Sequence, residues 1–343
     1  MNTPVRLALI GCGNQMQKNL IPFLQRTSQD YMPVVCVDPD ATRATYVQTV
    51  TRAYEWKSSI DGVDVSSIDA AIIAVPPQAS AELTEALVRQ GVHCFVEKPA
   101  GPSTDRLRKL AAVLGDTPSN VRVQVGFNFR YAEAIRQLHA LTSDVRNSPC
   151  AITIEFYSRH PSSPQWGVDT TVESWIRQNG VHAFDLARWL IPSPIARTDE
   201  HILVANDPDH FLATLTMHHT NGSLSTLRLG NQTQRFLVSV SVHAADGSVY
   251  SAPSLENVVL SRNAGMPSGM QLFGIKNLDH GWARSGFGPE LEAFLTACSR
   301  GRSTGPYPTV DDALAGSVLC DKVLAGIQPR FHAPHARLRE AVM

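Results

Sequence analysis

Three features are scarce in this chain of 343 residues: net charge, clustered cysteine and long apolar runs. Thirty basic residues stand against 31 acidic ones, and the net charge of -1 produces no strong field that would attract nucleic acid or an anionic membrane surface. No apolar run approaches the roughly 20 residues that a helix needs to cross a bilayer. We therefore expect neither nucleic acid nor a membrane as a partner.

The cysteines also lack any spacing that would bind a metal. They include no Cys-x-x-Cys pair and no cluster with histidine at zinc spacing, so the sequence predicts no metal site. Some lie in apolar, strand-like runs, which favours buried free thiols in a reducing compartment. The first strand begins almost at the first residue and leaves no room for a signal peptide, so we expect a cytoplasmic protein. The cysteines are Cys12, Cys36, Cys94, Cys150, Cys298 and Cys320.

What is present is the composition of an ordinary soluble globular chain, with 43% hydrophobic and 18% charged residues. Its length exceeds what most single hydrophobic cores can organise, and it predicts about two domains. No internal repeat or low-complexity segment divides the chain further.

Strand-like and helix-like segments alternate along the first third of the chain. The strands are nearly continuous apolar runs, which is typical of a parallel sheet covered by helices on both faces. Gly91 follows one helical stretch where a left-handed stop is expected, and Pro22 predicts a kink or an early end in the first helix. The predicted strands span residues 5–10, 33–37, 70–75, 92–96 and 121–125, and the predicted helices span 15–25, 79–90 and 103–114.

From about residue 150 the pattern changes to longer strands in which apolar and polar residues alternate. Asn221-Gly222 and Asp246-Gly247 lie between neighbouring strands, as tight hairpin turns require. Thr309, with Asp312 three residues later, resembles a capping box at the start of the last helix. Residues 125–343 are therefore assigned to an α+β domain with a large open, mostly antiparallel sheet. Its strands span 151–158, 211–218, 223–229, 236–243 and 249–252, and its helices span 182–190, 289–299 and 310–324.

The turn Gly11-Cys12-Gly13 directly follows the first strand and precedes a helical stretch. A glycine pair in that position offers main-chain donors to a pyrophosphate, which favours a Rossmann-type dinucleotide-binding domain in residues 1–124. Met16 stands where a third glycine usually lets helix and strand approach closely. Glycines alone can make a simple turn, but the strand before and the helix after them favour cofactor binding. The predicted contacts are Gly11, Gly13, Asn14, Gln15 and Met16.

Asp38 ends the second strand, 27 positions after Gly11. A carboxylate there can accept hydrogen bonds from the adenosine ribose hydroxyls and repel a 2′-phosphate, which favours NAD over NADP. The sequence Asp38-Pro39-Asp40 also suits a plain turn, and Arg43, one helical turn further on, could still accept NADP. We interpret Asp38 as the ribose-binding residue.

Segments spread over nearly the whole chain resemble the Gfo/Idh/MocA family of NAD(P)-dependent oxidoreductases. The glycine turn, the Glu-Lys-Pro segment and the Val-His segment occur in order, at family-like separations. The resemblance implies a redox enzyme that uses NAD, with NADP as the alternative, and a small carbohydrate-like substrate. It also implies cofactor contacts from Val75, Pro76, Glu97 and Lys98. The matching segments are Gly11-Cys12-Gly13, Pro76-Pro77, Glu97-Lys98-Pro99, Gly126 to Tyr131, Gly180 to Leu190 and Pro289 to Phe294.

Lys98 is the residue on which the predicted chemistry depends most. A loop lysine is ordinarily only solvated, but this one lies beside Pro99 at the carboxyl end of an apolar strand, the end that faces a bound cofactor. Together with the resemblance, this place predicts an ammonium that hydrogen-bonds the substrate oxygen and stabilises its alkoxide character. Glu97 is expected to fix the loop.

His182 is the second predicted catalytic residue. Imidazole titrates where proton exchange with an alcohol is useful, although a histidine at a helix start is often structural. In the resembled family this histidine lies near the substrate carbon, and an aspartate commonly stands four positions earlier. Here that position holds Gln178, whose amide can orient a hydroxyl but cannot relay a proton. Asp185 is expected to be a structural carboxylate of the same helix.

Further residues are predicted to line the substrate pocket from their order along the chain. The long polar segment from His160 to Ser174 would suit a lid over the substrate. His218 and His219 face opposite sides of a strand and cannot bind one metal together. The predicted pocket residues are Arg130, Tyr131, Tyr157, Arg159, Trp166, Gln178 and Asn179.

The functions that remain differ in class. One is an oxidoreductase that moves hydride between NAD(H) and a secondary alcohol or ketone of a sugar, sugar derivative or cyclitol; Lys98 and His182 favour it. Another is a dinucleotide-sensing regulatory protein without catalysis, favoured by Gln178, and a third is a reductase of imines or double bonds. Relatives commonly associate through the open sheet, one face of which must be covered, so we expect a homodimer or homotetramer.

Overall fold

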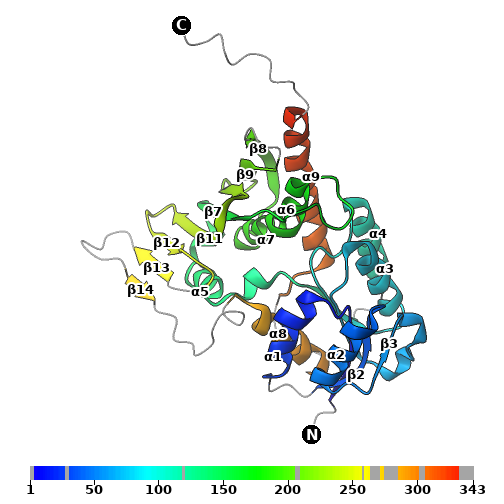
Figure 1. Cartoon of the computed structure of the whole chain (residues 1–343). Coiled ribbons are helices and arrows are strands. Elements are labelled where there is room, and N and C mark those ends of the chain that lie inside the picture. The colour runs from blue at the N-terminus through cyan, green and yellow to red at the C-terminus, as the bar shows by residue number, and fades with distance from the viewer. Residues whose placement is uncertain are drawn as a thin grey trace. The chain divides into compact units, whose positions relative to one another are not determined.

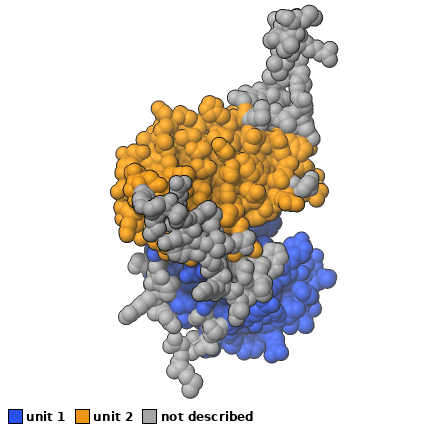
Figure 2. All heavy atoms as spheres, turned by 90° about the vertical axis from the view of Figure 1, so that its left-hand side faces the viewer, with its two compact units in different colours: residues 1–136, 276–315 blue, residues 137–275, 316–343 orange. Residues whose placement is uncertain are grey.

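The computed structural model describes residues 4–27, 31–117, 120–204, 209–256, 259–262, 271–273, 285–300 and 306–331. Figure 2 colours its two compact units: unit 1 comprises residues 1–136 and 276–315, and unit 2 comprises 137–275 and 316–343. The sequence interpretation placed a single boundary between residues 124 and 125. The units divide differently because helix α8 (Phe287–Arg300) contributes Leu291, Phe294 and Leu295 to the hydrophobic core of unit 1.

Unit 1 is built on a six-stranded parallel sheet in the order β3-β2-β1-β4-β5-β6. Figure 1 labels β2 and β3 of this sheet, drawn in blue. Strands β1, β4 and β5 are buried almost throughout, which explains their continuous apolar sequences. The predicted Rossmann-type fold is confirmed. The strands are β1 (Val5–Ile10), β2 (Tyr31–Val37), β3 (Glu55–Lys57), β4 (Ala70–Ile73), β5 (His93–Val96) and β6 (Val123–Val125).

The first helices of unit 1 show how local sequence shapes the connections. A π-helix, η1 (Met16–Leu20), leads into a single α-helical turn, α1 (Ile21–Leu24), so the first helix is short, as Pro22 predicted. The sequence interpretation missed α2 (Ala41–Thr51), because its polar residues lack apolar periodicity; Asp40 caps its first turn. The remaining α-helices of unit 1 before residue 132 are α3 (Pro77–Val88) and α4 (Thr104–Gly115), and its 3₁₀ helices are η2 (Ile60–Gly62), η3 (Val65–Ser67) and η4 (Asn128–Tyr131).

Unit 2 contains an eight-stranded sheet in the order β14-β13-β12-β11-β7-β10-β9-β8. Among the described strands of this second sheet, β7 and β10 form the only parallel pair. The predicted mostly antiparallel sheet is therefore confirmed. Asn221-Gly222 joins β9 to β10 and Asp246-Gly247 joins β11 to β12, as predicted. The strands are β7 (Cys150–Arg159), β8 (Ile195–Val204), β9 (Phe211–His219), β10 (Leu224–Gly230), β11 (Gln232–Ala244), β12 (Val249–Ala252), β13 (Val259–Arg262) and β14 (Gln271–Phe273).

Helices cover one face of this second sheet. Residues of β7 alternate between buried and partly exposed, and Phe156 on the buried side packs against Trp175 with ring centroids 5.4 Å apart. Trp175 also contacts Phe211 of β9 at 5.3 Å. The division between the units falls inside α5 and α9. The helices are α5 (Glu133–Leu141), η5 (Val145–Asn147), α6 (Thr171–Trp175), η6 (Ile176–Gly180), α7 (Val181–Leu190) and α9 (Val310–Phe331).

The predicted capping box at the start of α9 is confirmed. The Thr309 N–H donates to Asp312 Oδ2 at 2.9 Å, and the Asp312 N–H donates to Thr309 Oγ1 at 3.3 Å. No helix within the described ranges is both long and apolar enough to cross a membrane.

The start of α8 is pressed against η4. Gly286 has a φ of +103°, and a Cβ atom there would lie 1.9 Å from the main-chain oxygen of Asn128. Asn128 in turn donates from Nδ2 to the main-chain oxygen of Ser285 at 2.8 Å. Only glycine fits this junction, which therefore fixes where the start of α8 meets η4.

Replacing Gly286 by alanine should destabilise the protein more than the same change at Gly91. Both glycines have positive φ, which costs an L-residue about 1–2 kcal/mol, but no described atom lies within 4 Å of a Cβ at Gly91. The clash at Gly286 should add about 1–3 kcal/mol. Thermal unfolding of the two variants and the wild type measures the difference. Equal losses at the two positions would contradict the tight junction.

Candidate active site

The glycine turn after β1 combines a close approach with an open side. A Cβ at Gly11 would lie 2.4 Å from the main-chain oxygen of Ala74, so glycine is required for β1 and the end of β4 to lie this close. At Gly13, by contrast, no described atom lies within 4 Å of a Cβ position. This open side fits the close approach of a pyrophosphate to the main chain. Asn14 beside it is exposed and Gln15 is partly exposed.

Met16 fills the place of the missing third glycine without opening the structure. Its side chain is fully buried and belongs to the core that also contains Leu20 of η1 and Phe95 of β5. The wider π-helical turn that begins at Met16 accompanies this large residue. A cofactor contact from Met16, which stays a prediction, would therefore use its main chain.

Asp38 lies directly after β2, held beside the glycine turn. Its Oδ2 accepts the Cys12 N–H at 2.8 Å, and its Oδ1 accepts the Asp40 N–H at 2.8 Å. The Arg43 guanidinium donates to the same Oδ1 at 2.9 Å, and its side chain is 47% exposed. A carboxylate offers about four acceptor positions, so a fixed Asp38 can still accept a ribose hydroxyl.

Glu97 and Lys98 follow β5 at the same edge of the sheet. The Glu97 N–H donates to the main-chain oxygen of Ile73 at 2.9 Å, and Gln15 Nε2 donates to Glu97 Oε1 at 2.8 Å. These bonds join the loop that carries Glu97 and Lys98, the lysine loop, to β4 and to the glycine turn. They fit the expectation that Glu97 fixes the loop. Lys98 remains partly exposed.

The electrostatics of this loop are set by burial. Burial raises the pKa of Glu97, while its bond from Gln15 and the charge of Lys98 lower it in part. Burial also lowers the pKa of Lys98, and the carboxyl groups of Glu97 and Glu290 offset part of that shift. The ammonium of Lys98 therefore gives up its proton more readily than an exposed lysine does.

Val75 and Pro76 complete the edge. They follow β4, and Pro76 is the residue before the first turn of α3. Because carboxyl ends of parallel strands meet at one edge, the predicted residues after β1, β2, β4 and β5 lie together there. The arrangement fits a dinucleotide, with Gly13 free for its phosphates and Asp38 for its ribose.

Arg130 is placed differently from the other predicted residues of unit 1. It lies in η4, is only 7% exposed and pairs with Asp312 of α9, Nη2 to Oδ1 at 3.2 Å. The same carboxylate caps α9. This pair ties η4 to the start of α9, and a substrate contact from Arg130 stays a prediction.

In unit 2, a π-helical turn carries Gln178 and Asn179 directly before the helix of His182. These two side chains are partly buried, whereas His182 is 4% exposed and Asp185 is 1% exposed. Gln178 and His182 are four residues apart, so they lie on neighbouring turns. Interruptions of this kind are frequent at functional sites. The structure thus brings together three predicted residues of unit 2.

Trp175 fixes this helical segment on the sheet. Its Nε1 donates to Ser158 Oγ at 2.7 Å, so α6 covers the face of β7 that carries Phe156 and Ser158. Tyr157 lies between those two residues, and its side chain therefore points to the opposite face. The structure does not bring Tyr157 together with Gln178 and His182.

Trp166 has an unusual backbone, with a φ of +56° followed by Gly167 at +75°. Bulky residues rarely adopt this conformation, and such outliers concentrate at ligand clamps and switch regions. The Gln165 N–H donates to Ser174 Oγ at 2.8 Å, which ties the segment to α6. The lid role of residues 160–174 stays a prediction.

The described residues contain no group of histidine, cysteine or acidic side chains that could hold a metal. His218 contacts Asp199 at 2.7 Å, whereas His219 points inward to Ser225 at 2.7 Å, so they do face opposite sides of β9. All of the cysteines are free, and each is at least partly buried.

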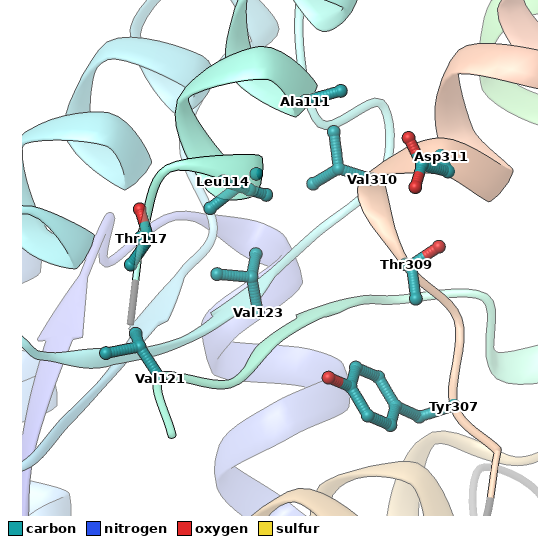
Figure 3. Close-up of a pocket in the computed structure, with 10 residues that line it drawn as sticks. Ala111, Leu114, Thr117, Val121, Val123, Tyr307, Thr309, Val310 and Asp311 are labelled. Atoms are coloured by element: carbon teal, nitrogen blue, oxygen red, sulfur yellow. The ribbon is translucent and has the colours of Figure 1, made fainter. Parts of the chain in front are cut away.

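A separate hollow of about 280 Å³ lies in unit 1 (Figure 3). Leu114, Val121 and Val123 line one side of it, and Tyr307 and Val310 line another. Val121 precedes β6, so the hollow lies toward the amino end of that strand. It contains none of the predicted site residues.

Sequence reasoning missed the buried carboxyl of Glu290. Its side chain is 0% exposed and interacts with the charges of Glu97 and Lys98. No local signal could have revealed it, because a glutamate in the first turn of a helix is common for its favourable interaction with the helix dipole.

Comparisons with known proteins agree with this geometry. The family model GFO_IDH_MocA, described as an oxidoreductase family with an NAD-binding Rossmann fold, matches residues 5–127. Inositol 2-dehydrogenase of Rhizobium meliloti is 25% identical over 294 residues, which cover 78% of this chain and 82% of that protein. Inositol 2-dehydrogenase of Leifsonia xyli is 28% identical over 206 residues, which cover 60% of this chain but only 59% of that relative's length.

Solved structures share the fold over nearly the whole chain. A dehydrogenase from Chromobacterium violaceum has a TM-score of 0.85 at 23% identity, with 96% of this chain and 99% of that chain covered. Levoglucosan dehydrogenase, in complex with NADH and levoglucosan, has a TM-score of 0.79 at 14% identity, with 95% and 98% covered. Residues 5–127 thus match the model of the Gfo/Idh/MocA oxidoreductase family with its NAD-binding Rossmann fold, and most of the chain is similar to an inositol 2-dehydrogenase.

Proposed function

We propose that this protein is an NAD-dependent dehydrogenase that moves a hydride between the cofactor and a secondary alcohol or ketone of a cyclitol or sugar. The observation that carries the proposal is the partly exposed Lys98, held at the same sheet edge as the open Gly13 turn and the fixed carboxylate of Asp38. The inositol 2-dehydrogenases among its relatives support the substrate class.

Bound NAD supplies the group that accepts or gives the hydride. The residues of unit 1 position it: the main chain around Gly13 faces the phosphates, and Asp38 accepts from the ribose. Val75, Pro76 and Glu97 line the same edge. Because Gln15 is hydrogen-bonded to Glu97, the phosphate turn and the lysine loop hold a fixed relation to each other.

Lys98 acts on the substrate oxygen. Its ammonium donates a hydrogen bond to that oxygen and stabilises the negative charge that develops there. A pKa lowered by burial also favours the exchange of a proton with an alcohol over that of an exposed lysine. His182, Gln178 and Asn179 are assigned to the substrate, since amide and imidazole groups can hydrogen-bond several hydroxyls.

A second candidate is a dinucleotide sensor on the same scaffold. Gln178 favours it, because the position that holds an aspartate in the resembled family here has an amide that cannot transfer a proton. A sensor binds NADH but turns over no polyol or ketone. Measurements of turnover separate the dehydrogenase from the sensor.

NADH should bind about tenfold more tightly than NADPH, a difference of about 1.4 kcal/mol. The carboxylate of Asp38 accepts ribose hydroxyls and repels a 2′-phosphate. Isothermal calorimetry with both cofactors measures the difference, and Asp38→Asn should reduce it. The control is Arg43→Ala, which should preserve the preference for NADH. Equal binding of NADPH by the wild type would show that Arg43 neutralises Asp38 and that the assignment is wrong.

Lys98→Ala should lower turnover by about 100-fold or more while NADH binding persists, because the lost interaction strengthens as charge develops on the oxygen. His182→Ala should also lower turnover, most where proton transfer limits the rate. The assay follows NADH absorbance with myo-inositol, sugars and their keto forms. The matched control is Lys109→Ala, an exposed lysine of α4, which should be neutral. Near-normal turnover in Lys98→Ala would reject the role of this lysine.

Gln178→Ala should raise the KM for the substrate and leave the Kd for NADH nearly unchanged, because Gln178 lies in unit 2 and the dinucleotide fold lies in unit 1. Steady-state kinetics and calorimetry test the two parts separately. The variant Gln178→Asp restores a carboxylate and should increase turnover if a proton relay is limiting. Loss of NADH binding in Gln178→Ala would contradict this placement.

A further inference from the structure

Glu290 is a buried acid that the proposed reaction has not yet used. It lies in the first turn of α8 and its side chain is 0% exposed. In the part of the chain that the structure describes, neither carboxyl oxygen has a hydrogen-bond partner. An ionised carboxylate in that position would lose its hydration without compensation, at a cost of several kcal/mol.

The packing of α8 directs Glu290 toward the lysine loop. Phe294, one helical turn further on, packs against Phe95 of β5 with ring centroids 5.8 Å apart. Glu290 and Phe294 share a face of α8, and Phe95 and Glu97 share a face of the sheet. Gln124, which pairs with Phe95 across β5 and β6, donates to the main-chain oxygen of Glu290 at 3.0 Å. The first turn of α8 is thereby fixed over the end of β5.

Other ionisable groups near α8 do not neutralise Glu290. The helix packs against β1, β5, η1, α1 and η4. The charges that act on Glu290 are those of Glu97, which repels it, and Lys98, which attracts it. The remaining ionisable groups of those elements have other surroundings: Arg6 pairs with Asp69, Arg130 pairs with Asp312, His93 accepts the Arg122 N–H, the Cys94 thiol contacts the main-chain oxygen of Val92, Tyr131 is partly exposed and Lys18 is exposed.

Two carboxyl groups thus face one ammonium. Glu97 accepts a hydrogen bond from Gln15 and is the neighbour of Lys98, so the negative charge is better stabilised on Glu97. Burial and the charge of Glu97 together raise the pKa of Glu290 well above its ordinary value.

We propose that Glu290 is a positioning residue for Lys98: it holds a proton at neutral pH, which leaves Glu97 as the single counter-charge of the ammonium, and it ionises only in alkaline solution. Once ionised, it helps Lys98 keep its own proton. The inference rests on the proposed role of Lys98 in hydride transfer. The protonation state of Glu290 can nevertheless be tested without turnover.

Infrared spectroscopy of the full chain tests the proton directly. A protonated carboxyl absorbs in a region separate from carboxylates, and Glu290→Gln should remove one such band at pH 7. The matched control is Glu292→Gln, an exposed glutamate of the same helix, which should leave the band intact. An unchanged spectrum in Glu290→Gln would overturn the proposal.

Unfolding as a function of pH gives an independent result. A carboxyl whose pKa is raised by folding binds its proton in the folded but not the unfolded protein, so its contribution to stability falls as pH rises above the unfolded pKa. Glutamine carries no such contribution. The melting temperature of Glu290→Gln, measured relative to that of the wild type, should therefore rise by about 2 °C per pH unit between pH 5 and 8. Glu292→Gln should follow the wild type, and a melting-temperature difference between Glu290→Gln and the wild type that stays constant from pH 5 to 8 would show that Glu290 is already ionised.

The pH profile of turnover tests the link to Lys98. With myo-inositol and NAD as the probe, the limb of the profile that Lys98 governs should move to lower pH in Glu290→Gln, because the charge that helps Lys98 hold its proton can no longer form. An unmoved limb would reject the coupling. If the wild type turns over no substrate, the proposed function has failed, while the infrared and unfolding results still decide the state of Glu290.

Discussion

The hydrogen bond from Gln15 to Glu97 is the contact on which the sheet edge of unit 1 depends. It joins the glycine turn, the proposed phosphate site, to the loop that carries Lys98, although the two segments are far apart in sequence. Asn19 extends it, because its Nδ2 donates to Gln15 Oε1 one turn later in η1. A lysine held by such a chain keeps its position relative to a bound dinucleotide, which is what oriented hydride transfer requires. Disrupting these hydrogen bonds would separate the glycine turn from the loop that carries Lys98.

Burial of charge is the second constraint, and it is satisfied by hydrogen bonds in some places and by protons in others. Asp38 accepts hydrogen bonds from three residues, Cys12, Asp40 and Arg43, and remains a fixed acceptor. Glu97 has Gln15 and Lys98. Glu290 has no such donor among the described residues, so a proton is the remaining way to lower its cost. The same physical requirement thus underlies the roles proposed for Asp38 as a ribose acceptor, Glu97 as a loop anchor and Glu290 as a neutral acid.

Much of the fold could be predicted from the sequence, because apolar strands and glycine turns act locally. The glycine turn, the strand ends and Asp38 were found from patterns of a few residues. The alternation of residues along β7 also predicts that Tyr157 faces away from Phe156. The pocket role of Tyr157 had been suggested by its order along the chain alone. Helix α2 was missed because its polar sequence has no apolar period. Glu290 was missed because its burial depends on α8 packing against a strand that lies almost 200 positions earlier.

The discontinuous make-up of unit 1 has a consequence for the order in which the chain is made. Strands β1 to β6 leave the ribosome first, yet α8, which supplies Leu291, Phe294 and Leu295 to their core, is among the last segments to emerge. Until then, apolar side chains such as Leu9 and Phe95 lack their final cover. Most of unit 2, residues 137–275, is synthesised during that interval. A nascent chain of this protein therefore carries an incomplete dinucleotide domain for most of its synthesis, the state in which exposed apolar surface attracts chaperones or other chains.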